Sequence, residues 1–171
     1  MNRKLQCLVV DDETMGIRLL EAFIRKINYL ELTGNFDDAS NALNYLETHD
    51  IDILFTDIQM PGINGLELVK SLPRPPVTIF ISAHRGFAPE GFETDAVDYL
   101  VKPVTFPRFE KAVTKAKNYL LLQFEAEKNQ GLKTSSLFVK SDNGYLNVLL
   151  EDILYFQAKG DYVLIVMKQK N

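Results

Sequence analysis

Short apolar runs alternate with amphipathic stretches along the first 125 residues of the chain. Five of these runs are rich in Val, Ile and Leu, which is typical of strands buried on both faces of a parallel sheet. Most are followed by a stretch in which apolar residues recur at helical spacing. The pattern predicts strands at Leu5–Val10, Leu30–Phe36, Ile51–Phe55, Val77–Ile81 and Val97–Val101.

The alternation of strand and helix predicts an α/β fold. Crossover connections of this kind are right-handed and place helices on both faces of a parallel sheet. We therefore expect a doubly wound, five-stranded parallel sheet with the flavodoxin-like order 2-1-3-4-5. The stretch after the fourth strand, Gly86–Thr94, is a weak helix because it contains Pro89 and Gly91, and we expect it to be short and mobile.

Chemically active side chains stand where four of the five strands end. Asp11 and Asp12 directly follow the first strand, and Asp57 comes two residues after the third. Ser82 follows the fourth strand and Lys102 follows the fifth. Because the carboxyl ends of parallel strands meet at one edge of the sheet, we expect these side chains to converge there, where open α/β sheets bind ligands.

Three carboxylates cannot lie together without compensating charge. Two of them about 4 Å apart repel by about 4 kcal/mol at an effective dielectric constant of about 20. Mg²⁺ suits such oxygen ligands, and Lys102 supplies a second positive charge. With the charge offset, an oxygen of Asp57 can attack a phosphorus atom and form an acyl phosphate, while Ser82 donates a hydrogen bond to a phosphoryl oxygen.

Taken singly, each of these residues has an ordinary structural explanation. An acid at a strand end is most often a helix cap or a turn residue, and Lys102 or Ser82 alone would be a loop or surface residue. Pro103 is a typical helix-start proline, although a Lys-Pro bond at a strand end also suits a cis peptide. The joint arrangement supports the chemical interpretation, because separate explanations would each have to place a residue at the end of the right strand.

Charge and composition limit the classes of function. The 171 residues have a formal net charge of −4, which argues against a nucleic-acid footprint over the whole chain. Residues 1–131 contain 19 acidic and 14 basic residues, whereas the rest contain 4 and 5. The single cysteine, Cys7, cannot form an internal disulfide and suits a buried strand position. No apolar run approaches the ~18 residues of a membrane span, so we expect a cytoplasmic protein without a membrane partner.

Four motifs together resemble the response-regulator receiver domain, and we assign residues 1–125 to it. They are Leu8–Asp12, Thr56–Gly62, Ser82–Ala83 and Asp98–Pro103. The resemblance implies that a sensor histidine kinase phosphorylates Asp57. It also implies that Asp11, Asp12 and Asp57 hold Mg²⁺ together with the backbone carbonyl of Gln59.

Three further roles follow from the same resemblance. Ser82 and Tyr99 would form a switch pair, in which the hydroxyl moves toward the phosphoryl group and the aromatic ring turns inward. Lys102 would pair with the phosphoryl group. A homodimer is expected to form on phosphorylation, through a surface that the resemblance implies.

The pattern changes after residue 125. Residues 126–136 are polar and include Gly131, which predicts a linker. Short strands joined by turns follow and indicate an all-β module. Residues 149–163 resemble the opening of the LytTR-type DNA-binding domain, so we expect 137–171 to be the N-terminal part of that domain, stopping in mid-fold. The full-length protein should then bind DNA, whereas this chain should not bind it specifically.

The predicted function is a phosphoryl-accepting receiver of a two-component transcriptional regulator, not an enzyme. One alternative is an unphosphorylated scaffold that only binds partners. A second is a phosphatase with an aspartyl nucleophile on a parallel sheet. That class requires Asp-x-Asp after the first strand, and Asp11-Asp12-Glu13 lacks this spacing.

Overall fold

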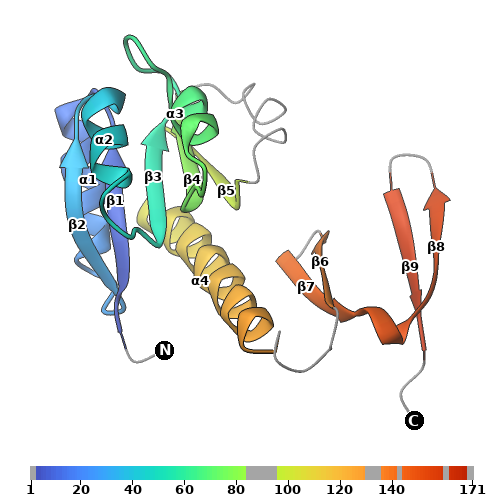
Figure 1. The fold of residues 1–171 in the computed structure, drawn as a ribbon. Coiled ribbons are helices and arrows are strands. Elements are labelled where there is room, and N and C mark those ends of the chain that lie inside the picture. Colours follow the sequence, from blue (N-terminus) through green and yellow to red (C-terminus); the bar gives the residue numbers. More distant parts are fainter. Residues whose placement is uncertain (1–2, 84–95, 130–135, 142–143, 160–161, 169–171) are drawn as a thin grey trace. The chain divides into compact units, whose positions relative to one another are not determined.

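The computed structural model describes residues 3–83, 96–129, 136–141, 144–159 and 162–168 (Figure 1). The chain divides into two compact units, Met1–Lys117 and Asn118–Asn171. None of the helices in the described ranges is long and apolar enough to cross a membrane.

A five-stranded parallel sheet forms the centre of the first unit, in the order β2-β1-β3-β4-β5 (Figure 1). This confirms the predicted fold class and strand order. The strands are β1 (Leu5–Val10), β2 (Leu30–Phe36), β3 (Ile53–Asp57), β4 (Val77–Ser82) and β5 (Asp98–Val101). All residues of β3 and β4 are buried, as expected for strands covered on both faces.

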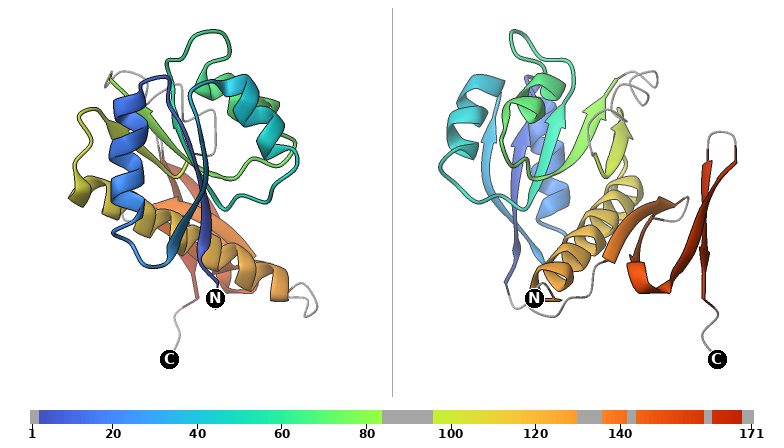
Figure 2. Two further views of the ribbon diagram at one scale, coloured as in Figure 1. Left: turned by 90° about the vertical axis from the view of Figure 1, so that its left-hand side faces the viewer. Right: turned by 45° about the vertical axis from the view of Figure 1, so that its right-hand side comes forward.

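Helices cover both faces of this sheet. Figure 2 shows α1 and the start of α4 against one face, with α2 and α3 against the other. Their bounds are α1 (Thr14–Ile24), α2 (Ala39–Leu46), α3 (Gly65–Ser71) and α4 (Phe106–Asn129). The predicted helix at Gly86–Thr94 lies outside the described residues.

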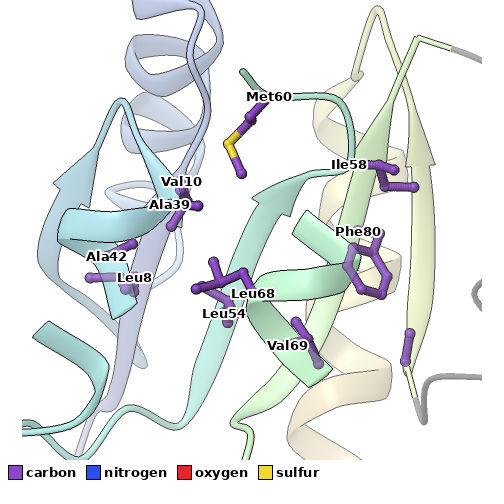
Figure 3. Close-up of a cluster of buried hydrophobic side chains, with 11 residues drawn as sticks. Leu8, Val10, Ala39, Ala42, Leu54, Ile58, Met60, Leu68, Val69 and Phe80 are labelled. Carbon is purple, nitrogen blue, oxygen red and sulfur yellow. The ribbon is translucent and has the colours of Figure 1, made fainter. Parts of the chain in front are cut away.

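The apolar core lies in two layers, one on each face of the sheet. On the α2 and α3 side, side chains from β1, β3 and β4 pack with side chains from both helices. The set includes Leu8, Val10, Leu54 and Phe80 from the strands, Ala42 from α2 and Leu68 from α3 (Figure 3). On the other side, the ring of Phe109 lies 5.1 Å from that of Phe55 and 5.5 Å from that of Phe23. Burying one such side chain contributes about 1.5–3 kcal/mol, so these layers hold the strand ends in place.

The loop from β3 to α3 is shaped by local signals that the sequence contains. Gly62 has a φ of 77°, a left-handed conformation that glycine adopts without strain. Asn64 caps α3: its side chain accepts from the Glu67 amide, and the Glu67 carboxylate accepts from the Asn64 amide. This capping box starts α3 directly after the loop that follows Asp57.

The second unit contains two antiparallel hairpins. β6 (Ser136–Ser141) pairs with β7 (Gly144–Leu149), and β8 (Ile153–Lys159) pairs with β9 (Tyr162–Met167). This agrees with the predicted partial all-β module. Helix α4 extends to Asn129, so the first four residues of the segment predicted as a linker are helical.

Candidate functional site

Side chains from three separate strand ends meet at the carboxyl edge of the sheet. Asp11 follows β1, Asp57 ends β3, and Lys102 follows β5. The Lys102 ammonium nitrogen lies 2.6 Å from Asp57 Oδ2 and 3.0 Å from Asp11 Oδ2. Because 45 and 91 positions of sequence separate Lys102 from these partners, only the parallel sheet brings them together.

Backbone hydrogen bonds fix the ends of the strands. The Asp11 amide donates to the Phe36 carbonyl at 3.1 Å, and the Lys102 amide donates to the Ser82 carbonyl at 2.8 Å. The Lys102–Pro103 peptide bond is cis. The positions from which the charged side chains extend are therefore set by the sheet itself.

Asp11, Asp12 and Asp57 form an acidic cluster. One carboxylate oxygen from each lies within 4.8 Å of the others. Asp11 is fully buried and Asp57 is 5% exposed, whereas Asp12 is exposed. Three oxygens at this separation can contact one cation.

The electrostatics of the cluster favour an additional cation. Burial raises the pKa of Asp11, and hydrogen bonds from the Glu13 amide and from Lys102 oppose the rise only in part. Asp11 Oδ2 lies beside Lys102 without hydrogen-bond geometry, and it accepts no hydrogen bond from the described residues. A buried carboxylate oxygen in this position suits a hard ion, and an all-oxygen donor set suits Mg²⁺.

Two glycines allow the surrounding helices to approach the acidic residues closely. A Cβ atom on Gly65 would lie 2.0 Å from the backbone oxygen of Asp57. A Cβ atom on Gly16 would lie 2.3 Å from Asp11 Oδ2. Larger residues at either position would displace one of the two buried aspartates.

The remaining predicted site residues occupy different positions around the cluster. The Gln59 amide donates to Asp57 Oδ1 at 3.0 Å, which places its backbone beside the carboxylate. Ser82 is buried at the end of β4 and pairs in register with Val101 rather than with Tyr99. Tyr99 is half-buried on β5, and its ring lies 5.3 Å from that of Phe80.

Sequence reasoning missed the contact between Glu13 and Lys102. Glu13 Oε2 lies 3.1 Å from the Lys102 ammonium nitrogen. Burial opposes ionisation of Lys102, but hydrogen bonds to Asp57, Asp11 and Glu13 raise its pKa above the ordinary value. The position of Glu13 immediately after two strand-end acids was the only available signal.

A second missed interaction holds β5 against α4. Arg108 on α4 donates to both carboxylate oxygens of Asp98, at 2.7 and 2.8 Å, and to the Tyr99 carbonyl at 2.7 Å. Although burial opposes it, the hydrogen bonds from Arg108 and from the Tyr99 amide lower the pKa of Asp98. This ion pair anchors the strand from which Lys102 extends.

A cleft of about 530 Å³ opens beside the Lys102 end of the cluster. The residues that line it include Glu13 and Lys102, and also Met15 and Leu19 on α1. Met15 is 75% exposed, which is unusual for a large apolar side chain on an amphipathic helix. The cluster is therefore accessible from the side of α1.

Known proteins are similar to the part of the chain that contains the acidic cluster and Lys102. The family model described as the response regulator receiver domain matches residues 7–114. The receiver domain of mrkE from Klebsiella pneumoniae has a similar structure, with a TM-score of 0.62 and 29% sequence identity. That alignment covers 67% of this chain and 97% of the mrkE domain.

Curated relatives are longer than this chain. The sensory transduction protein LytR of Staphylococcus saprophyticus is 29% identical over 166 residues, covering 88% of this chain and 65% of the relative. The positive alginate biosynthesis regulatory protein of Pseudomonas aeruginosa is 30% identical over 170 residues, covering 94% of this chain and 68% of the relative. The chain thus spans about two thirds of the length of these proteins.

Proposed function

This chain belongs to the response regulator receiver family, and from that premise we propose that Asp57 accepts a phosphoryl group from a sensor histidine kinase. The strongest support for this proposal is the 2.6 Å contact between Asp57 Oδ2 and the Lys102 ammonium nitrogen, which lies beside two further carboxylates. This contact supports the proposal because the Asp57 oxygen, the proposed nucleophile, lies next to a cation that can neutralise phosphoryl charge.

The transfer uses one carboxylate oxygen of Asp57. This oxygen attacks the phosphorus atom of a phosphohistidine, the new oxygen–phosphorus bond forms as the phosphorus–nitrogen bond breaks, and the imidazole leaves with the electron pair. The Gln59 amide orients Asp57 through Oδ1, so the carboxylate has a defined direction. Lys102 neutralises charge on the phosphoryl oxygens.

Asp11, Asp12 and Asp57 would hold Mg²⁺, with the backbone carbonyl of Gln59 as a fourth protein ligand. When bound, the ion offsets the negative charge of the carboxylates and of the transferred group. Asp11 contributes a buried oxygen that accepts no hydrogen bond from the part of the chain that the structure describes. The exposed Asp12 forms the outer side of this site.

The signal would pass from Asp57 to the rest of the protein through Ser82 and Tyr99. Ser82 lies at the end of β4, next to the strand that carries Asp57. Its hydroxyl can move toward the phosphoryl group and donate a hydrogen bond to one of its oxygens. Tyr99 packs at the edge of the core cluster, so a change in its rotamer alters the surface of β5. Phosphorylation would thereby favour one of two receiver states and a homodimer.

The output of the complete protein would be transcription. Residues 137–171 would form the first part of a LytTR-type DNA-binding domain, joined to the receiver by the segment 126–136. The names of the relatives, which include a transcriptional regulatory protein, support this assignment. Specific DNA binding belongs to the full-length protein and is not expected of residues 1–171.

Treatment with acetyl phosphate and Mg²⁺ tests the phosphoryl-accepting function. Intact mass spectrometry should show one added phosphoryl group on the wild type and none on Asp57→Asn. Asp50→Asn, an exposed acid before β3, is the matched control and should be modified like the wild type. Modification of Asp57→Asn at the wild-type rate would exclude Asp57 as the acceptor. No modification of the wild type would favour a scaffold that only binds partners.

A further inference from the structure

We propose that Glu13 is a positioning residue that holds Lys102 in the unphosphorylated protein and releases it when Asp57 accepts a phosphoryl group. The inference rests on the proposed function, and it assigns a role to a side chain outside the predicted metal ligands. Glu13 would therefore slow phosphorylation without affecting the stability of the modified state.

Lys102 has a limited number of hydrogen-bond donors. An ammonium group has three N–H donors. This one donates to three carboxylates: to Asp57 Oδ2 at 2.6 Å, to Glu13 Oε2 at 3.1 Å and to Asp11 Oδ1 at 3.2 Å. All three donors face acids in the unphosphorylated protein, so a phosphoryl oxygen can bind Lys102 only by displacing one of them.

Burial decides which acid is displaced. The side chain of Glu13 is 66% exposed, whereas that of Asp11 is 0% exposed. Asp57 loses its charge when it forms the acyl phosphate, but its carbonyl oxygen can still accept a hydrogen bond from Lys102. A released Glu13 carboxylate is hydrated at once, but a released Asp11 would be a buried charge without its partner. The contact with Glu13 is therefore the one that a phosphoryl oxygen replaces.

This exchange predicts an asymmetric effect on rates. The contact with Glu13 stabilises the starting state but is absent when Lys102 binds the phosphoryl group. Weakening the contact raises the free energy of the starting state, and this lowers the free-energy barrier to phosphoryl transfer. It leaves the later hydrolysis unchanged, because Lys102 contacts the phosphoryl group both before and during that step.

The test measures the rate of phosphorylation by acetyl phosphate. The Mg²⁺ concentration is chosen for each variant so that it is saturating. In the reaction an oxygen of Asp57 bonds to phosphorus as the bond from phosphorus to the acetate oxygen breaks, and acetate leaves with the electron pair. Glu13→Gln should accelerate this step about two- to fivefold, the range expected for an exposed ion pair. Hydrolysis of the phosphorylated protein should keep the wild-type rate. Glu47→Gln removes the same charge from the exposed end of α2 and should change neither rate.

A second variant separates the contact from its charge. Glu13→Asp keeps the negative charge but shortens the side chain by one methylene, so that it no longer reaches Lys102. It should accelerate phosphorylation as Glu13→Gln does. If Glu13→Asp behaves like the wild type, general repulsion of the anionic donor explains the effect and the proposal is wrong.

Binding of beryllium trifluoride, a phosphoryl analogue, provides a readout without turnover. Glu13→Gln should bind it more tightly than the wild type by the same factor as the gain in rate. Slower phosphorylation or weaker binding would mean that Glu13 supports Lys102 throughout, which contradicts the release. A wild type that is not phosphorylated at all would instead refute the function of Asp57, so the two failures are distinct.

Discussion

Asp11 shows at the scale of one residue how a buried acid opposes the stability of the fold that holds it. Its carboxylate is fully buried, and burial raises its pKa. A raised pKa means that the folded protein binds the proton more tightly than the unfolded chain. The contribution of Asp11 to stability is thus greatest below the ordinary value of 3.8 and falls as the pH rises from there through the folded pKa.

Replacement of Asp11 by asparagine tests this conflict. At neutral pH without divalent ions, Asp11→Asn should raise the free energy of unfolding by about 1 kcal/mol, a typical size for one substitution, because a buried charge is removed. Urea denaturation in EDTA measures it. Added Mg²⁺ should stabilise the wild type and have less effect on the variant. A variant less stable than the wild type in EDTA would show that the ion pair with Lys102 outweighs the desolvation of Asp11.

The residues of the site differ in how far sequence alone could predict them. The positions of Asp11, Asp57 and Lys102 could be predicted from the sequence, because a residue at a strand end lies at a known edge of the sheet. The contact of Glu13 with Lys102 could not be predicted, since it depends on the path of an exposed side chain from the residue just before α1. No periodicity in the sequence encodes that path.

At the scale of elements, apolarity predicts burial better than it predicts strand limits. β1 and β2 begin and end where the apolar pattern does. β3 was expected at residues 51–55 but runs from Ile53 to Asp57, because Thr56 and Asp57 are buried polar residues that still pair with neighbouring strands. A prediction based on apolar residues alone therefore ends the strand too early where its last residues are buried but polar.

The start of α3 depends on Gly65. A methyl group there would overlap the Asp57 carbonyl oxygen, so Gly65→Ala must move the backbone of β3 or of α3. We expect a loss of about 2–3 kcal/mol in the free energy of unfolding, in the range for overpacking, and slower phosphorylation of Asp57. Urea denaturation and phosphorylation assays measure the two effects.

Gly34→Ala is the control for this substitution. A Cβ atom at Gly34 would lie 3.1 Å from a methyl group of Leu8, which can yield by a few tenths of an ångström. Its effect should be smaller, and the rate of phosphorylation should be unchanged. If both variants lose the same stability and rate, the close approach of α3 to Asp57 has no special importance.

The ion pair between Asp98 and Arg108 couples β5 to α4. Asp98→Asn should lower the free energy of unfolding by about 2 kcal/mol at neutral pH, the order expected for hydrogen bonds to a largely buried charge. Because the pKa of Asp98 is lowered, this stabilisation is present above its ordinary value of 3.8 and is lost as the pH falls through the folded pKa. The difference between wild type and variant in urea denaturation should therefore shrink in acid. A constant difference at all pH values would assign the effect to packing rather than to charge.

At the scale of the molecule, the distribution of buried residues separates the two units. The apolar layers around the sheet, which include Leu8, Phe55, Phe80 and Phe109, lie within Met1–Lys117. Among the described side chains of β6 to β9, only Val148 is buried, while Leu154, Tyr155 and Phe156 are more than half exposed. The first unit thus has a core of its own, whereas the two hairpins supply little core within these residues.

This distribution predicts that residues 1–125 fold and react without the rest of the chain. The core and every residue of the proposed site lie within them, so the shortened protein should unfold cooperatively and be phosphorylated by acetyl phosphate within twofold of the rate for residues 1–171. Circular dichroism during urea denaturation and intact mass spectrometry measure both properties. Residues 130–171 alone should give no cooperative transition, because paired hairpins with exposed apolar faces are marginal in water. A receiver that loses phosphorylation on removal of residues 126–171 would show that these residues contribute to the reaction at Asp57, and residue 125 would then not be a functional boundary.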